Sequence, residues 1–376
     1  MNTDLKPKYS QSIIDYKILW FELSNQYAIV NNGLFYCIEI YFNLDTINLC
    51  VNAYKDEFNL TEEQASALYK DINKFLIDRN TPEPENLKPK YNLELNNRVI
   101  SKSYTSEGLN FKIHVQSDTL LSYIHPQICH LETSDISKPD FWFDIHEANQ
   151  KIMLFKNNQF IKACETQHFH ELQGKFNMEL ISSLYGKEEH DWIGLFHAST
   201  VAKNSESIML IGTSGSGKST LTTILAHHGY QLIADDTTPI LRADLNTYYF
   251  PGGISIKPGA FSTIKPLIPN FDNIPQSFLR AYKGGIKYIA PPKPKQNHLP
   301  CKSIVLINYK KDADVILDTL DAKTALEILI PDSWISPKPE NAKAFLNWIS
   351  TVTFYRLTYS NNQDAIDIFS TIFKDE

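Results

Sequence analysis

The first 80 residues change from short apolar runs to longer stretches with helical spacing. Residues 16–23, 27–30 and 34–41 are rich in aromatic and β-branched side chains, which favour strands. The Asn-Asn-Gly sequence at 31–33 predicts a tight turn between the last two strands. Residues 46–58 then predict a helix. The pattern therefore predicts a small α+β unit, with three strands followed by helices.

A further helix is predicted to begin after Thr61. Thr61 and Gln64 have the spacing of a capping box, in which each side chain accepts a hydrogen bond from the other residue's backbone N–H. Apolar residues then recur on one helical face, at Ala65, Leu68, Ile72, Phe75 and Leu76. We expect this stripe to pack in the core of the unit.

Residues 80–86 contain two prolines among polar and charged residues, which neither a helix nor a central strand tolerates. We place a domain boundary there, between units at 1–85 and 86–376. In the second unit, strands are expected at 111–115, 151–155, 303–308 and 352–357, and helices at 321–329, 341–349 and 363–373. Residues 141–143 form an apolar cluster that we expect in the core.

The strongest chemical signal is a phosphate-binding loop. An apolar stretch at 207–211 leads into Gly-x-x-x-x-Gly-Lys-Ser, and a predicted helix follows. The loop consists of Gly212, Thr213, Ser214, Gly215, Ser216, Gly217, Lys218, Ser219 and Thr220. Glycines let backbone N–H groups wrap phosphates, and the helix N-terminus adds partial positive charge. Lys218 would reach the β- and γ-phosphates of a nucleotide, and the Ser219 hydroxyl suits Mg²⁺.

An acidic pair follows the loop closely. Residues 231–234 form a short apolar strand that ends in Asp235 and Asp236, 18 residues after Lys218 at the second aspartate. A parallel crossover would return this strand to the sheet next to the first strand, so that its end lies beside the phosphate loop. Two carboxylates there can hold Mg²⁺ and accept a proton from a nucleophile.

The charge and composition argue against a nucleic-acid-binding or membrane-spanning protein. The 376 residues carry 36 basic and 43 acidic side chains, a net charge of −7, and residues 1–90 alone have a net charge of −4. We therefore expect no nucleic-acid partner. No run of about 18 apolar residues predicts a membrane span, and the start lacks the apolar stretch of a signal peptide. The five cysteines form no Cys-x-x-Cys pair and indicate reduced thiols in a cytoplasmic protein.

An acidic pair one short helix after the loop lysine resembles the HPr kinase/phosphorylase family, which is related in fold to phosphoenolpyruvate carboxykinase. That family also has a histidine ahead of its phosphate loop, and His197, 15 residues before Gly212, matches it. The resemblance implies an α/β P-loop kinase domain of that fold, with ATP and Mg²⁺ as cofactors. HPr kinases are oligomeric, so it also implies a homo-oligomer.

The stretches at 195–202, 250–258 and 287–292 resemble the divergent HPr-kinase-like proteins associated with ribosomal-peptide biosynthesis. Authentic HPr kinases have a glutamate and an Arg-Gly pair before a later glycine-rich loop, and residues 252–255 lack both. This departure argues against HPr itself as the phosphate acceptor and against the reverse phosphorolysis reaction.

The pattern of three strands followed by helices in residues 10–80 resembles the PqqD-like peptide-recognition domain, a small winged-helix fold that recognises leader peptides. The resemblance implies that a precursor peptide adds to the edge of the third strand, at residues 35–42 here. A plain structural subdomain is the alternative, and many of the aromatic residues in that segment would then belong to the core.

The predicted function is an ATP-dependent kinase that phosphorylates a Ser or Thr hydroxyl of a ribosomally made precursor peptide. Ser219 and Asp236 hold Mg²⁺, and Lys218 stabilises the transferring phosphoryl group. Asp235 or Asp236, aided by His197, deprotonates the hydroxyl, and adjacency does not tell the two aspartates apart. The alternatives are a kinase of a small hydroxylated metabolite and a non-catalytic, nucleotide-dependent peptide-binding protein.

Basic residues after the acidic pair could neutralise phosphate charge. Lys257 and Arg280 are the two candidates. Lysines at 283, 287, 293 and 295 make the Pro- and Gly-rich segment around them basic. This segment is either a mobile loop that faces the substrate or a solvated linker.

Overall fold

The N-terminal unit consists of three antiparallel strands and three helices. The strands, in the order β1-β2-β3, are β1 (Tyr9–Ile13), β2 (Tyr16–Phe21) and β3 (Gln26–Asn31). In the computed structural model, which describes residues 3–82, 91–278 and 284–373, they are followed by α1 (Asn32–Asn43), α2 (Ile47–Phe58) and α3 (Glu62–Asn80). The strands predicted at 16–23 and 27–30, the helix at 46–58 and the capping box are confirmed.

The strand predicted at 34–41 is wrong, because these residues lie in α1. The Asn31 side chain accepts a hydrogen bond from the backbone N–H of Leu34 at 2.8 Å and caps the helix. Cys37, Ile38 and Tyr41 are then buried on one helical face. The Asn-Asn-Gly signal thus starts a helix instead of closing a hairpin, and residues 35–42 offer no strand edge to a peptide.

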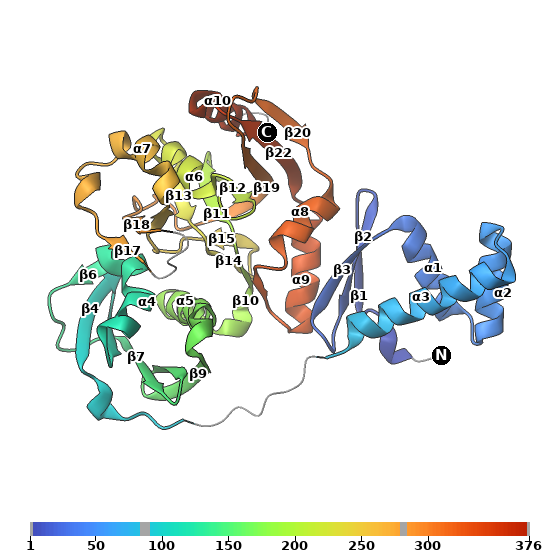
Figure 1. Cartoon of the computed structure of the whole chain (residues 1–376), viewed down its shortest axis with the longest axis horizontal. Coiled ribbons are helices and arrows are strands. Elements are labelled where there is room, and N and C mark those ends of the chain that lie inside the picture. Colours follow the sequence, from blue (N-terminus) through green and yellow to red (C-terminus); the bar gives the residue numbers. More distant parts are fainter. Residues whose placement is uncertain (1–2, 83–90, 279–283, 374–376) are drawn as a thin grey trace.

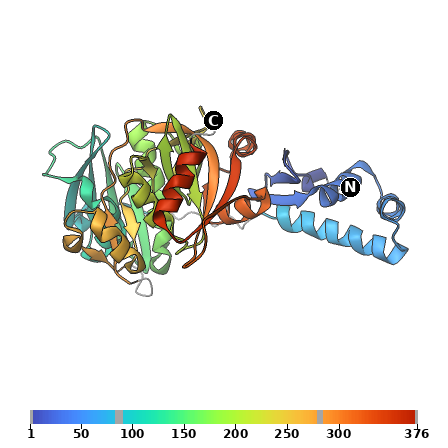
Figure 2. The same ribbon diagram turned by 90° about the horizontal axis from the view of Figure 1, so that it is seen from above.

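The N-terminal sheet is buried on both faces, because successive side chains of a strand point to opposite sides. Leu19 and Phe21 pack against α1–α3. Ile18 and Trp20 pack into a second core with residues of α8 (Ala322–Leu329) and α9 (Pro339–Ile349). Figures 1 and 2 show the blue strands between these two groups of helices. The sheet therefore joins the N-terminal helices to the C-terminal third of the chain.

A six-stranded sheet follows, in the order β6-β4-β5-β7-β8-β9. Its strands are β4 (Ile100–Ser106), β5 (Leu109–Val115), β6 (Glu132–Thr133), β7 (Phe141–Ala148), β8 (Lys151–Lys156) and β9 (Gln159–Glu165). Helices α4 (Asp118–Ile128) and α5 (Phe169–Tyr185) share its core. The strands predicted at 111–115 and 151–155 are confirmed, and of the cluster expected in the core Phe141 and Phe143 are buried, whereas Trp142 is only half-buried.

The largest sheet has ten strands and carries the phosphate loop. Its main path is β13-β11-β12-β19-β15-β14-β10-β21, and β22 joins β19 and β20 beside it. The strands are β10 (Trp192–Phe196), β11 (Ser199–Lys203), β12 (Glu206–Ile211), β13 (Gln231–Ala234), β14 (Thr238–Leu241), β15 (Asn246–Tyr248), β19 (His298–Tyr309), β20 (Ile316–Thr319), β21 (Trp334–Ile335) and β22 (Thr353–Tyr359). Helices α6 (Lys218–His227), α7 (Phe261–Ile264) and α10 (Asn362–Ile372) lie in this part of the chain. The strands and helices predicted beyond residue 300 are confirmed to within a few residues.

One topological prediction needs correction. The acidic strand β13 runs parallel to β12, but it does not lie next to it, because the antiparallel strand β11 pairs with both. Since β11 runs the opposite way, its first residue, Ser199, lies at the edge where β12 and β13 end. The chain therefore places the start of β11 between the phosphate loop and the acidic pair.

The fold is a mixed α/β arrangement of several sheets. The expected boundary at 85/86 falls among residues 83–90, outside the described part of the chain. Among the helices that the structure describes, none has both the length and the apolar character to cross a bilayer.

Candidate functional site

The phosphate loop connects β12 to α6, as the sequence predicts. Two of its glycines are required by the geometry. A Cβ on Gly212, whose φ is +149°, would come within 2.6 Å of the Ser216 Oγ atom and 3.1 Å of the Ile307 carbonyl oxygen, so a side chain there would strain the loop. Gly217 caps α6 with a left-handed φ of +99°, and a Cβ there would approach Tyr309 at 3.2 Å. The loop is thus tightly turned and presents the N-terminus of a ten-residue helix.

Lys218 is held inside this loop. Its Nζ atom is buried and donates a hydrogen bond to the carbonyl oxygen of Gly212 at 2.5 Å. Burial lowers the pKa of the ammonium, and the nearby charges of Asp236 and Asp235 oppose that shift. Because both carboxylates act on this lysine, the acidic pair lies close to the phosphate loop.

Asp235 is the most enclosed group of the site, with 1% of its surface exposed. Its Oδ1 atom accepts a hydrogen bond from the Ser199 hydroxyl at 2.5 Å, and its Oδ2 atom accepts one from the Ser255 backbone N–H at 3.0 Å. The Ser219 hydroxyl of the phosphate loop lies on the same side and favours the charged form of this carboxylate. One carboxyl group at the end of β13 therefore binds both β11 and the segment at 255.

The pKa of Asp235 is raised from 3.8 to about 7, first by burial and then by the charge of Asp236. Hydrogen bonds from Ser199, Ser255 and Ser219 favour the charged form and oppose this rise. The direction follows from geometry, because a carboxylate this far from water loses its hydration and has another carboxylate beside it. A carboxyl group with a pKa near neutrality can both accept and return a proton at physiological pH.

Asp236 has a different environment. It is half-buried, and its Oδ2 atom accepts a hydrogen bond from the Ser255 hydroxyl at 2.8 Å. Its φ is +58°, and the Thr237 N–H donates to the Asp235 carbonyl at 2.8 Å around it, so that Asp236 occupies the centre of a three-residue turn. A non-glycine residue in this region is strained, and such strain concentrates at functional sites. The turn separates the two carboxylates into an enclosed one and an accessible one.

His197 lies at the turn between β10 and β11, two residues before Ser199. The residue is half-buried, and its backbone N–H donates to the Ser333 hydroxyl at 3.0 Å. Within the described part of the chain, its imidazole makes no hydrogen bond with Asp235 or Asp236. The backbone thus brings His197 to the edge of the sheet that carries the acidic pair.

Lys257 reaches the phosphate loop from β16 (Ile254–Ile256), and its Nζ atom donates to the Ser214 hydroxyl at 2.9 Å. Strand β16 pairs with β18 (Ile286–Ile289), which also pairs with β17 (Gln276–Ser277). Two segments that the sequence analysis singled out, at 250–258 and 287–292, therefore lie side by side. Arg280 and Lys283 fall outside the described residues.

The prediction that the basic segment near 287 is a loop or linker is wrong for Lys287. This residue is buried in β18, and its Nζ atom donates to the carbonyl oxygens of Phe271 and Asp272 at 2.7 and 3.1 Å. Its ammonium also lies 4.6 Å from the Phe271 ring centroid. Lys287 therefore stabilises the fold around β18 and is not presented to a substrate.

Sequence reasoning gave no role to several residues that the structure places here. Ser199 and Ser255 contact the acidic pair, and both lie in segments singled out by resemblance, but a hydroxyl's partner cannot be read from its neighbours. Asn177 of α5, the helix that packs on the six-stranded sheet, donates to the Thr237 hydroxyl at 3.5 Å and supports the acidic turn. Burial lowers the pKa of Lys218, and the negative charge of Asp332, in the turn after α8, opposes that shift. No spacing signal links either residue to the loop.

Among the described residues, no group of three or more His, Cys, Asp or Glu side chains is placed to hold a metal ion. The oxygen donors near the loop are the Ser219 hydroxyl and the two aspartates. Such a set suits a cation that keeps several waters or phosphate oxygens, as Mg²⁺ does, and does not suit a closed all-protein metal site.

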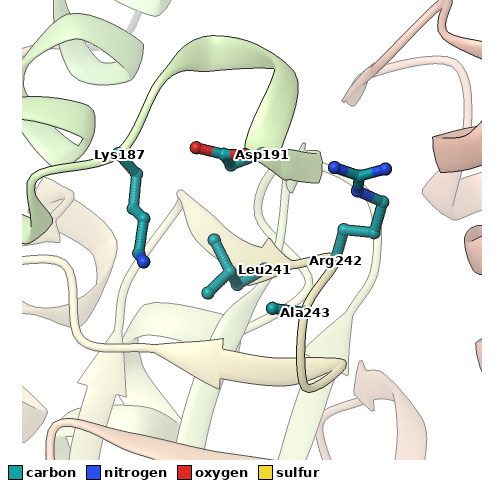
Figure 3. Close-up of a pocket in the computed structure, with 5 residues that line it drawn as sticks. All are labelled: Lys187, Asp191, Leu241, Arg242 and Ala243. Atoms are coloured by element: carbon teal, nitrogen blue, oxygen red, sulfur yellow. The ribbon is translucent and has the colours of Figure 1, made fainter.

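A hollow of about 330 Å³ lies elsewhere, lined by Lys187, Asp191, Leu241, Arg242 and Ala243. Figure 3 shows Lys187 and Arg242 on either side of Leu241, with Asp191 above. The Arg242 backbone N–H donates to the Asp191 carbonyl at 2.8 Å, which holds the two walls together. No residue of the phosphate loop or of the acidic pair lines this hollow, so it is separate from the candidate site.

Comparisons with known proteins find structural likeness but no sequence relative. No protein-family model matches the chain, and no curated protein matches it. Among solved structures, the HPr(Ser) kinase/phosphatase from Coxiella burnetii aligns with 11% sequence identity and a TM-score of 0.23, covering 48% of this chain and 94% of that one. Because a TM-score of this size does not define a common fold, the function is inferred below from the side chains of the site.

Proposed function

We propose that this protein is an ATP- and Mg²⁺-dependent phosphotransferase that acts on a hydroxyl group. The observation that carries the proposal is the place of the buried Asp235 carboxyl beside the phosphate loop: the Ser255 N–H donates to it, and Lys257, two residues further on, donates to Ser214 of the loop. It joins a phosphate-binding loop to an acid with a pKa near neutrality. A loop that only bound phosphate would have no need of such an acid.

The loop fits a nucleotide phosphate chain. Its glycines permit a tight turn, and Lys257 adds a second cation at Ser214. The Ser216 Oγ atom is buried and has no hydrogen-bond partner in the described part of the chain, so a polar donor or acceptor of the loop is left for a ligand. Bound MgATP would supply the phosphoryl group and neutralise its charge.

The two aspartates suit different roles. Asp236 is half-buried and strained, and with Ser219 it offers oxygen ligands on the accessible side, so we assign these two residues to Mg²⁺. Asp235 is the proposed base. The Ser199 hydroxyl that donates to its carboxyl group is itself buried, so the half-buried Ser219 hydroxyl is the group that could pass a proton to Asp235 from the loop side. Lys218 would orient the phosphate and balance its charge.

The acceptor that we propose is a Ser or Thr hydroxyl of a ribosomally made precursor peptide, held by the N-terminal unit. The support is the arrangement of three strands followed by three helices, in which β3 is an edge strand that pairs, among the described residues, only with β2. Residues 26–31 replace the segment at 35–42 as the strand to which a peptide could add.

Intact-mass spectrometry tests this proposal with the full chain, MgATP and the short peptide encoded beside its gene. The expected result is one added phosphate on the peptide, absent with Lys218→Ala. ATP consumption with an unchanged peptide would reject the peptide acceptor and favour a small hydroxylated metabolite. ATP binding without any consumption would reject the phosphotransferase itself.

A further inference from the structure

The turn between β2 and β3 contacts the segment that follows α8. Asn25 lies at this turn with a left-handed φ of +53°. Its Oδ1 atom accepts a hydrogen bond from the Trp20 indole at 2.9 Å, and its Nδ2 atom donates to the Ile335 carbonyl oxygen at 3.0 Å. A single side chain thus connects the N-terminal sheet to residues more than 300 positions later in the chain.

The segment at 333–336 is in turn bound along β10, the strand that ends one residue before His197. Ile335 pairs with Gly194 in β21 and β10, and the Ser336 N–H donates to the Ile193 carbonyl at 3.1 Å. The Ser333 hydroxyl accepts the hydrogen bond from the His197 backbone N–H. Contacts with one short segment therefore fix the course of β10 up to His197.

Aromatic packing gives a second connection to the same point. The Tyr27 ring of β3 meets the Phe345 ring of α9 edge-on, with centroids 5.0 Å apart, and Phe345 stacks on Phe196 at 5.8 Å. Phe196 directly precedes His197. The hydrogen-bonded connection through Asn25 and the aromatic one through Tyr27 converge on the end of β10, although they use different atoms.

We propose that Asn25 and Tyr27 are positioning residues for the candidate active site: the N-terminal sheet holds the end of β10, and with it His197, beside the acidic pair. The kinetic part of this inference rests on the proposed function, whereas the structural part does not. Loosening either contact would displace His197 and leave nucleotide binding intact, because neither residue contacts the loop between β12 and α6. The N-terminal unit would then affect catalysis through its contacts with the rest of the chain, whether or not it also binds a peptide.

Two substitutions in the full-length protein test the hydrogen-bonded connection. Asn25→Asp keeps an oxygen for the Trp20 indole but loses the N–H that binds Ile335. Asn25→Gly loses both bonds while relaxing the left-handed backbone, which guards against a failure to fold. The matched control is Asn59→Asp, the same chemical change at an exposed residue with φ of +50°, in the cap of α2.

Hydrogen–deuterium exchange across residues 192–198 is the first readout. We expect exchange to be about tenfold faster in both Asn25 variants and unchanged in Asn59→Asp. The second readout is turnover, where kcat should fall about tenfold while KM for ATP stays constant. Unchanged exchange in both Asn25 variants would overturn the inference. If the wild-type protein transfers no phosphate, the proposed function fails, and the exchange experiment still decides whether the N-terminal sheet holds β10.

Discussion

Asp235→Asn should make the protein more stable, and increasingly so as the pH rises. The wild-type carboxyl group is 1% exposed and has a pKa of about 7, against 3.8 in the unfolded chain. Between these values the folded state binds more protons than the unfolded state, so the free energy of unfolding falls as pH increases. Asparagine is never ionised and removes this loss. Its amide can keep both contacts, because the Ser199 hydroxyl accepts as well as donates and the amide oxygen can face the Ser255 N–H.

The size of the effect follows from the pKa difference. A gap of about three units corresponds to about 4 kcal/mol at 1.36 kcal/mol per unit, which is the full difference above the folded pKa. At about pH 5, roughly one unit of this gap has already reduced the stability of the wild type, because the carboxyl group is ionised in the unfolded chain and still protonated in the folded one. The advantage of Asp235→Asn over the wild type should therefore grow by about 3 kcal/mol between about pH 5 and pH 8.

Urea unfolding at a series of pH values measures this advantage directly. Asp236→Asn is the informative companion, because it removes the charge that helps raise the Asp235 pKa. In that variant the pH-dependent loss of stability should shift to lower pH. If the difference between Asp235→Asn and the wild type stays constant across the range, the carboxyl group is ionised throughout, and the reasoning about its burial is wrong.

Three further predictions concern the phosphate loop and the packing of the N-terminal sheet against α9. Gly212→Ala should weaken ATP binding by at least about tenfold in isothermal calorimetry, since its Cβ would collide with Ser216; unchanged affinity would contradict the loop geometry. Lys257→Ala should raise the Kd for ATP about tenfold with little change in thermal stability. If the Kd for ADP rises by the same factor, Lys257 contacts the inner phosphates and not the γ-phosphate. Tyr27→Phe should stabilise the protein by about 1 kcal/mol in urea, because the buried Tyr27 hydroxyl has no partner among the described residues; a lower unfolding midpoint would show that this hydroxyl is bonded.

Local sequence signals predicted the elements that depend on local chemistry. The capping box at Thr61, the phosphate loop and the helices beyond residue 320 are each set by residues within a few positions of one another. The wrong strand at 34–41 has a local cause too: its aromatic and β-branched residues favour a strand, whereas the Asn31 side chain caps a helix. Apolar and aromatic side chains indicate that a segment is buried, but they do not show whether it is a helix or a strand. Helix α1 buries one face, as a strand in the same place would.

The candidate site could be predicted only in part, because its remaining members come from distant segments. The sequence indicated Lys218, the acidic pair and Lys257 by spacing and resemblance. It could not show that β11 lies between β12 and β13, which depends on strand order across the whole sheet. For the same reason Ser199 and Ser255 remained without roles until their hydroxyl and backbone groups were seen at the carboxylates.

The two-faced burial of the N-terminal sheet has a consequence for how the protein is made. One face is covered by α1–α3 as soon as these helices leave the ribosome, but the face with Ile18 and Trp20 is covered only by α8 and α9. At synthesis rates of about 5–20 residues per second, that apolar face stays open for roughly 15 to 60 seconds while the intervening chain is translated. The nascent N-terminal unit is therefore a natural client for chaperones, and fragments that omit α8 and α9 should aggregate.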